Sequence, residues 1–278
     1  MGISVNAKSS KKGSRHQIPI SAIFLDYDGT ISPPNVPRVE SKVAAETTEI
    51  LEQIGERIPI AIVTSKDPWF VIPRTRFAGA WSTISGLDNR IGDKSHEPPM
   101  QPKKLELLAA ALEFANLRMP SLGVDVEEKR NSQGQLIAFC VDWRRSKDEK
   151  AAKTCAKAFA ACLNARSLTV KSFRGDPFFD VYAKPVDKGK AVRNLRRAYG
   201  LTRGLLFMGD SKADNPAFKA SDVSVAVLSH ESKVKDLVSD YSVSFNRVSE
   251  FLRQLFCNHL FFDSDFACLS PNRNTRGT

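Results

Sequence analysis

The sequence predicts an α/β protein in which a parallel sheet lies between helices and a second, α+β domain is inserted. Continuous apolar segments alternate with helical segments before residue 97 and after residue 185, which is typical of a parallel sheet covered on both faces. Between these residues, helices alternate with pairs of strands of period-2 hydrophobicity, which favours an antiparallel sheet with one open face. We therefore expect a discontinuous core domain, residues 18–96 and 186–257, and an inserted cap domain, residues 97–185.

The elements of the core domain follow from the apolar pattern. Strands are predicted at residues 18–26, 58–64, 80–84, 205–209 and 223–228. Helices are predicted over residues 39–54, 187–199 and 248–256. The first helix should bury one face, formed by Val43, Ile50, Leu51 and Ile54. Gly200 should end the second helix, since glycine adopts the left-handed conformation of a C′ residue without penalty.

The inserted domain is expected to contain two units, each of which is a helix followed by a hairpin. Helices are predicted over residues 103–117 and 148–163, each followed by two strands. The predicted hairpins are 123–129 with 135–143, joined by a turn at NSQG, and 168–171 with 178–182, joined by a turn at 174–177.

The two ends of the chain differ in composition from the domains. Residues 1–17 carry Lys8, Lys11, Lys12 and Arg15 without an acid, four of the positive charges behind a net charge of +10. We interpret them as a disordered, solvated tail, with non-specific attraction to RNA or phosphate as the alternative. The sequence has no nucleic-acid-binding motif. Residues 258–278 are expected to form a C-terminal tail in which Phe261 and Phe262 pack on the body and the last residues are disordered.

Composition excludes several classes of protein. With 278 residues, 42% hydrophobic and 26% charged, the chain resembles a soluble protein. Apolar runs stay short of the roughly 18 residues that span a bilayer, and the N-terminus lacks a secretory h-region. The cysteines show no metal-site spacing, so we interpret them as reduced, mostly structural thiols of a cytoplasmic protein. We expect a monomer without a membrane partner. The cysteines are Cys140, Cys155, Cys162, Cys257 and Cys268.

The segment FLDYDGTIS ends an apolar strand with two carboxylates, Asp26 and Asp28, followed by Gly29 and Thr30. Ligands of open α/β sheets bind beyond the carboxyl ends of the strands. Removing two carboxylates from water there requires a cation or a proton. Carboxylates on a strand-end loop suit Mg²⁺, which prefers one or two of them with waters and a substrate phosphate.

Polar residues at further strand ends match this pair chemically. Thr64 ends the second strand with a hydroxyl for a phosphoryl oxygen, and Ser65 beside it is a further substrate-binding candidate. Lys188 opens the helix after the inserted domain, and Asp210 and Asp214 follow the strand LLFMG. Metal ligands, a hydroxyl, an ammonium and an attacking carboxylate together predict phosphoryl transfer through an aspartyl phosphate.

Each residue taken singly has a structural explanation. Asp28-Gly29 could form a turn, the Thr64 hydroxyl could satisfy backbone groups, Lys188 could be solvated, and Asp210 could cap the following helix. The ordered set is specific, because three of the four segments stand at strand ends.

This ordered set resembles the four motifs of the haloacid dehalogenase superfamily: DYDGT, Thr64, Lys188 and GDSKAD. The resemblance covers about Ile18 to Phe256 and implies a Rossmann-like core, an Mg²⁺ cofactor and catalytic roles for Asp26, Asp28, Thr64 and Lys188. Asp26 would be the nucleophile and Asp28 the general acid and base. Thr64 and Lys188 would hold the phosphoryl oxygens. The metal ligands would be Asp26, the Asp28 carbonyl, Asp210 and Asp214.

The cap resembles that of the trehalose-phosphate phosphatase branch, which implies a sugar-phosphate substrate. DYDGTISP, VEEK, Trp143-Arg144 and FFDVYAKPVDKGKAV are similar to segments of that branch. The matching positions nominate as sugar-binding residues Glu127, Lys129, Arg144 and Asp180. Exposed strand charges without a ligand are the alternative interpretation.

Departures from the branch affect the sugar-reading positions more than the reacting ones. Asp180 stands where the branch usually has Glu, Asp142 where it has His, and Gly86-Leu87-Asp88-Asn89 replaces Gly-x-His-Gly. A serine at position 211, where the branch has a second Asp, is more similar to the motif of phosphatases that act on mannosylphosphoglycerate or sucrose phosphate. Other phosphorylated glycosides, a sugar phosphomutase and a non-catalytic sugar-phosphate-binding protein therefore stay open as alternatives to a trehalose 6-phosphate-like substrate.

Overall fold

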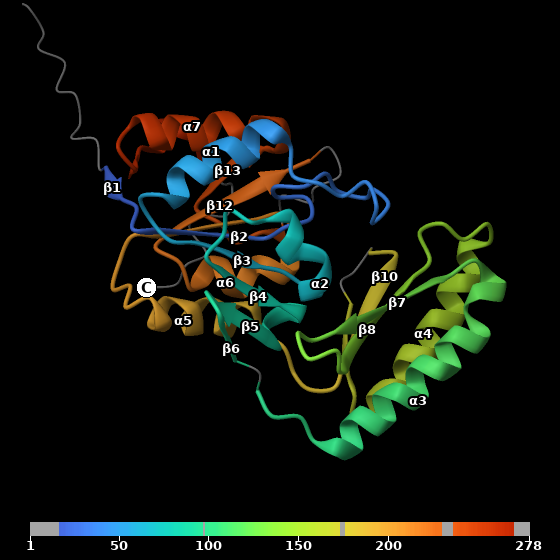
Figure 1. Cartoon of the computed structure of the whole chain (residues 1–278). Coiled ribbons are helices and arrows are strands. Elements are labelled where there is room, and N and C mark those ends of the chain that lie inside the picture. The colour runs from blue at the N-terminus through green and yellow to red at the C-terminus, as the bar shows by residue number, and fades with distance from the viewer. Residues whose placement is uncertain (1–16, 97, 173–175, 230–235, 270–278) are drawn as a thin grey trace, which may run out of the picture.

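The computed structural model describes residues 17–96, 98–172, 176–229 and 236–269. Two sheets dominate it (Figure 1). The larger sheet has nine strands, which are, in chain order, β2 (Ala22–Leu25), β3 (Ile60–Val63), β4 (Ala80–Thr83), β5 (Asp88–Ile91), β6 (Lys94–His96), β11 (Leu205–Gly209), β12 (Val223–Leu228), β13 (Tyr241–Ser244) and β15 (Cys268–Leu269). Their spatial order is β15-β13-β12-β11-β2-β3-β4-β5-β6.

The centre of the large sheet is parallel and its edges are antiparallel. Strands β13, β12, β11, β2, β3 and β4 run parallel to one another, as the apolar segments predicted. Strands β5 and β6 at one edge and β15 at the other add antiparallel pairs that the sequence did not indicate. The sheet is therefore mixed, and its parallel centre aligns the carboxyl ends of β2, β3 and β11.

Helices cover both faces of the large sheet. The helices are α1 (Ala45–Gly55) and α7 (Val248–Cys257) on one face, and α5 (Lys188–Ala198) and α6 (Asn215–Lys219) on the other. Alternation along β2 shows the two layers, because Ile23 and Leu25 pack with the first pair and Ala22 and Phe24 with the second. A strand buried on both faces must be continuously apolar, which is why these segments were recognisable.

The smaller sheet forms one layer of the inserted segment. Its elements are α3 (Pro102–Arg118), β7 (Asp125–Arg130), β8 (Leu136–Asp142), α4 (Glu149–Ala165), β9 (Thr169–Lys171) and β10 (Phe178–Tyr182). The strand order is β7-β8-β10-β9, antiparallel throughout. Phe139, Val141 and Phe179 pack under α3 and α4, and the opposite face lies toward the large sheet (Figure 1).

Two predicted elements of the N-terminal half differ in the structure. The helix predicted from residue 39 begins at Ala45, because Tyr27 donates a hydrogen bond to the Ser41 carbonyl (2.9 Å) and the Ser41 and Ser32 hydroxyls lie 2.8 Å apart. These buried tertiary hydrogen bonds hold residues 39–44 outside the helix. The strand predicted over residues 18–26 is split into β1 (Ile18–Pro19) and β2.

The segment predicted as a C-terminal tail belongs to the core as far as residue 269. Strand β14 (Phe261–Phe262) pairs with β1, and β15 extends the large sheet. Phe262 is buried as expected, but Phe261 is 41% exposed. Residues 1–16, residues 270–278 and the first two residues of the turn predicted at 174–177 lie outside the described residues.

Smaller expectations can also be checked. Gly200 has a φ of +64° after α5, consistent with the predicted C′ position. The five cysteines are free, as expected, although Cys162, Cys257 and Cys268 are exposed. Within the described part of the chain, each helix is too short or too polar to cross a bilayer.

Candidate active site

Residues from three neighbouring strands meet at the carboxyl edge of the large sheet. Asp26 follows β2, Thr64 follows β3 and Asp210 follows β11. Because β11, β2 and β3 are adjacent and parallel, the three side chains leave the sheet at the same end. The structure thus brings together the strand-end residues that the sequence singled out.

Lys188 lies at the centre of this group. Its Nζ is 2.8 Å from Asp26 Oδ2 and donates a hydrogen bond to Asp214 Oδ1 at 2.6 Å. All three residues are buried. Lys188 opens α5, where the Asp187 side chain caps the helix by accepting a hydrogen bond from Gly189 N at 2.8 Å. The helix start therefore fixes the position from which the ammonium reaches the Asp26 carboxylate.

Asp210 and Asp214 come from one tight turn after β11. Asp214 Oδ2 accepts hydrogen bonds from the backbone N–H groups of Asp210 (3.2 Å) and Ser211 (3.0 Å) and from the Ser211 hydroxyl (3.0 Å). This arrangement is a capping box, in which Ser211 precedes the short 3₁₀ helix Lys212–Asp214. Both oxygens of Asp214 are consequently engaged by protein groups.

A glycine of the DYDGT motif makes room for Asp210. Gly29 has a φ of +70°, and a Cβ at this position would lie 2.1 Å from Asp210 Oδ2. No side chain fits there, and the left-handed backbone conformation also favours glycine. The DYDGT loop and the turn after β11 are therefore packed against each other at the site.

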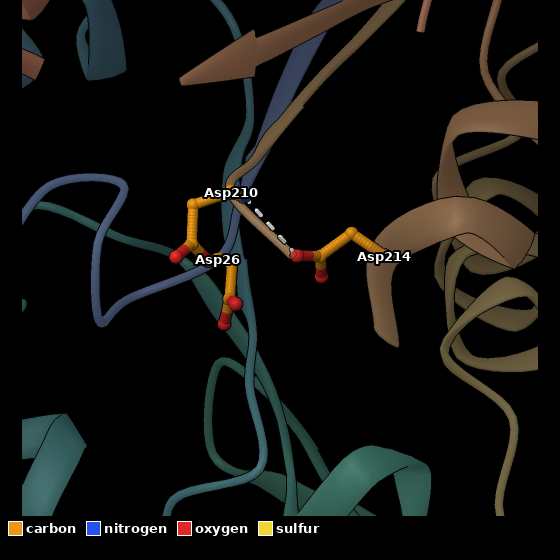
Figure 2. A group of neighbouring side chains, drawn as sticks. All are labelled: Asp26, Asp210 and Asp214. Atoms are coloured by element: carbon orange, nitrogen blue, oxygen red, sulfur yellow. Dashed lines mark hydrogen bonds between the residues drawn. The ribbon is translucent and has the colours of Figure 1, made fainter. Parts of the chain in front are cut away.

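The carboxylates are close enough to share a cation. One oxygen each from Asp26, Asp210 and Asp214 lies within 4.8 Å of the others (Figure 2). Burial raises the pKa of Asp26 to about 7, an effect that Lys188 opposes and Asp214 reinforces. Burial and the neighbouring carboxylates Asp214 and Asp26 raise the pKa of Asp210 well above its ordinary value. One ammonium among three carboxylates leaves negative charge that a divalent cation with hard oxygen preference would balance, so the residues fit Mg²⁺.

Asp28 and Thr64 both contact Lys66. The Asp28 side chain is 40% exposed, accepts a hydrogen bond from Ser41 Oγ at 3.2 Å and lies 3.3 Å from Lys66 Nζ. Burial alone would lower the pKa of Lys66, but Asp28 and Glu127 raise it. Thr64 is buried, and its Oγ1 accepts from Lys66 N at 3.2 Å, which leaves the hydroxyl proton for a phosphoryl oxygen. Ser65 is partly buried beside it.

Three of the four nominated sugar-binding residues share one face of the small sheet. Glu127, Lys129 and Asp180 lie on the face of the small sheet that is turned to the core, where Glu127 and Asp180 are both opposite Cys140. Lys129 and Asp180 are buried and joined at 2.5 Å, and Asp180 accepts from the Tyr182 hydroxyl at 3.1 Å.

Glu127 and Arg144 are partnered by residues of the core. Glu127 accepts from Arg38, and Arg144 donates to Asn35 at 2.7 Å while pairing with Asp142. These two cap side chains therefore contact the loop that follows the DYDGT motif. The structure brings all the nominated residues to the boundary of the two domains but not into the carboxylate cluster.

Sequence reasoning missed the cations that line this boundary. Lys66 stands two residues after Thr64, so its place in the segment IVTSK was an available signal. No signal in the sequence marked Arg38 and its partner Asp67, because Arg38 lies in an irregular loop whose path depends on tertiary contacts.

Comparisons with known proteins find similar proteins among sugar-phosphate phosphatases. The family model described as sucrose-6F-phosphate phosphohydrolase matches residues 138–249. A trehalose-6-phosphate phosphatase-related protein of Thermoplasma acidophilum is 25% identical over 262 residues, covering 84% of this chain and 97% of that protein. The trehalose-phosphate phosphatase of Mycobacterium avium is 25% identical over 72% of the chain, which spans only 51% of that protein.

Solved structures share the fold. The C-terminal domain of the C. albicans trehalose-6-phosphate phosphatase superposes with a TM-score of 0.68 at 18% identity, covering 86% of this chain and 93% of that one. The crystal structure of a trehalose-6-phosphate phosphatase related protein gives a TM-score of 0.63 at 21% identity, covering 86% and 99%. Motifs, fold and relatives together show that the chain is similar to phosphatases of the haloacid dehalogenase type, and that its relatives include trehalose-phosphate phosphatases.

Proposed function

We propose that the chain is an Mg²⁺-dependent phosphatase that hydrolyses a trehalose 6-phosphate-like sugar phosphate through an aspartyl phosphate on Asp26. The observation that carries this proposal is the buried contact of 2.8 Å between the Asp26 carboxylate and Lys188, beside Asp210 at the carboxyl edge of the sheet. The contact holds a nucleophile and a phosphate-binding cation at the place where α/β sheets bind ligands.

The carboxylates of Asp26 and Asp210 and the Asp28 carbonyl would hold the Mg²⁺. When bound, the ion supplies positive charge that stabilises the transferring phosphoryl group. Asp214, also nominated as a ligand, has both carboxylate oxygens hydrogen-bonded to Lys188, Asp210 and Ser211. These hydrogen bonds support a positioning role for Asp214, which would hold the Lys188 ammonium and the turn that carries Asp210.

In the first half of the reaction, an Asp26 carboxylate oxygen attacks phosphorus and the bond from phosphorus to the sugar oxygen breaks. Asp28 donates its proton to that oxygen, so the sugar leaves as an alcohol. In the second half, water attacks the phosphorus of the aspartyl phosphate, Asp28 takes a proton from this water, and the bond from Asp26 to phosphorus breaks. Thr64 and Lys188 hold the phosphoryl oxygens throughout, and inorganic phosphate is released.

The inserted segment, residues 97–185, would act as a cap that reads the sugar. Its charged residues, namely Glu127, Lys129, Arg144 and Asp180, would then contact the substrate, which is supported by the position of Glu127, Lys129 and Asp180 on one face of the small sheet. The paired Lys129 and Asp180 can exchange their mutual contact for hydrogen bonds to sugar hydroxyls.

A sucrose phosphate substrate is the second candidate. It is favoured by the family model that matches residues 138–249 and by Ser211, which stands where the trehalose-phosphate branch has a second Asp. The reacting residues surround only the phosphate, so they serve either sugar equally. The choice between the two depends on the cap.

A substrate panel with Mg²⁺ tests the proposal. It should contain trehalose 6-phosphate, sucrose 6-phosphate, a mannosylphosphoglycerate and p-nitrophenyl phosphate, with release of inorganic phosphate as the readout. We expect the highest kcat/KM for trehalose 6-phosphate. Phosphate release from p-nitrophenyl phosphate alone would disprove the sugar assignment, and transfer to a second sugar without free phosphate would show a mutase.

A further inference from the structure

One arginine bridges the core and the cap, with a hydrogen bond to each. Arg38 lies in the loop between the DYDGT motif and α1. One end of its guanidinium donates to Glu127 on β7 of the cap, and the other end donates to Asp67 of the core. The same guanidinium therefore bridges two carboxylates, one from each domain.

The core side of this bridge is rigid. Asp67 is buried and caps α2 (Pro68–Val71), where its Oδ1 accepts from Phe70 N at 2.9 Å. The Arg38 guanidinium carbon lies 4.3 Å from the centre of the Phe70 ring. A planar guanidinium held on an aromatic face and by a fixed carboxylate is preorganised to receive a second carboxylate.

The loop that carries Arg38 also contacts Asp28. Ser41 of this loop donates to Asp28 Oδ1 at 3.2 Å, and its carbonyl is fixed by the Tyr27 hydroxyl at 2.9 Å. Asn35 of the same loop accepts from Arg144 of the cap at 2.7 Å. Residues 33–44 thus contact the cap through Arg38 and Asn35. They contact the Asp28 carboxylate through Ser41.

We propose that Arg38 is a positioning residue that holds the cap against the core through Glu127, and that residues 33–44 couple this closure to Asp28. Without the guanidinium, the carboxylates of Asp67 and Glu127 would lose their shared cation and repel each other, which favours separation of the domains. The catalytic meaning of the closure rests on the proposed function, whereas the bridge itself does not.

Hydrogen exchange at the cap hairpin measures closure without any turnover. The Ser132 N–H, in the turn between β7 and β8, donates to Asp88 Oδ2 of the core at 2.6 Å. This amide loses its partner when the cap separates from the core, so its exchange rate reports the open population. Because Arg38 makes charged hydrogen bonds to both domains, Arg38→Ala should accelerate exchange roughly ten- to a hundred-fold.

Arg74 provides a matched control. Its guanidinium carbon lies 4.2 Å from the centre of the same Phe70 ring, and it donates to the Phe70 carbonyl at 2.9 Å, both within the core. Arg74→Ala removes a comparable ring contact but no bridge to the cap. It should leave exchange at Ser132 within about threefold of the wild type.

Glu127→Gln removes the bridge from the cap side with little change of shape. It should accelerate exchange as Arg38→Ala does, and the double variant should exchange no faster than the faster single variant. Unchanged exchange in both single variants, or equal acceleration in Arg74→Ala, would overturn the proposal. If Arg38→Ala does not fold, Glu127→Gln and Arg74→Ala still decide between these outcomes.

The kinetic measurement separates this proposal from the proposed function. If Arg38 acts through Glu127, the losses in kcat/KM for the best sugar phosphate should be non-additive in the double variant. Additive losses would show that Arg38 does not act through Glu127. Failure of the proposed function would appear as no phosphate release from sugar phosphates by the wild type, which leaves the exchange measurement intact.

Discussion

The carboxyl edge of the large sheet and the open face of the small sheet both concentrate charge, but they hold it differently. At the sheet edge, Asp26, Lys188 and Asp214 are buried and contact one another within a single domain. On the cap, Glu127 is partly exposed and has its cationic partner, Arg38, in the other domain. The proposed reacting groups are therefore positioned within the core, whereas the proposed sugar recognition would depend on how the domains meet.

The first prediction tests the core side of this comparison by removing the proposed attacking group, the Asp26 carboxylate. Asp26→Asn should reduce turnover on the order of 10⁴-fold or more, because an amide cannot attack phosphorus. Steady-state phosphate release checks this loss, and circular dichroism should show an unchanged fold, since the two side chains are nearly isosteric. Substantial Mg²⁺-dependent activity in the variant would disprove the aspartyl-phosphate mechanism.

The second change separates the two halves of the reaction. Asp28→Asn should still permit phosphorylation by p-nitrophenyl phosphate, whose leaving group needs no proton, while hydrolysis slows roughly 10²- to 10⁴-fold without the base. A burst of p-nitrophenol followed by slow turnover is the expected trace. If the variant turns over an alkyl sugar phosphate as fast as the wild type, Asp28 has no acid or base role.

The third prediction concerns the charge balance of the core. Mg²⁺ at about 100 times its Kd should stabilise the folded protein by about 2.7 kcal/mol, because it binds the native carboxylate cluster. Thermal unfolding with and without Mg²⁺ measures this shift, and Asp210→Asn should abolish most of it. The control is Asp142→Asn, which alters a cap carboxylate paired with Arg144 and should keep the shift. A full shift in the Asp210 variant would place the ion elsewhere.

The smallest expected effect lies on the cap. Arg144→Ala should lower kcat/KM for the sugar phosphate roughly ten- to a hundred-fold, the cost of a hydrogen bond to a charged group. Hydrolysis of p-nitrophenyl phosphate, which offers no hydroxyls, should hardly change. Parallel losses on both substrates would instead assign Arg144 to folding or closure.

The positions of the proposed reacting residues were predictable because their signals are local. Asp26, Thr64 and Asp210 each end an apolar strand, and strands of one parallel sheet end at the same edge. Lys188 opens an amphipathic helix whose bounds were also close to those observed. In these cases the residue and the element that positions it lie within a few positions of each other, so periodicity and spacing were sufficient.

The misassigned segments depend on distant partners. The loop before α1 has helical periodicity, but buried hydrogen bonds between Tyr27, Ser32 and Ser41 hold it outside the helix. The C-terminal strands β14 and β15 are only two residues long, and their pairing with β1 and β13 has no local signature. Tertiary hydrogen bonds overrode local propensity at both places.

The sequence by itself determined the strand-end chemistry, because strand and helix periodicities place Asp26, Thr64, Lys188 and Asp210 without knowledge of the partners across space. Only the tertiary structure decided the pKa of the carboxyl groups and which residues from distant parts of the chain lie beside them. Burial raises the pKa of Asp26, and the path of residues 33–44 places Arg38 between Asp67 and Glu127. Both depend on desolvation and on contacts between residues far apart in the chain, which a one-dimensional pattern does not contain.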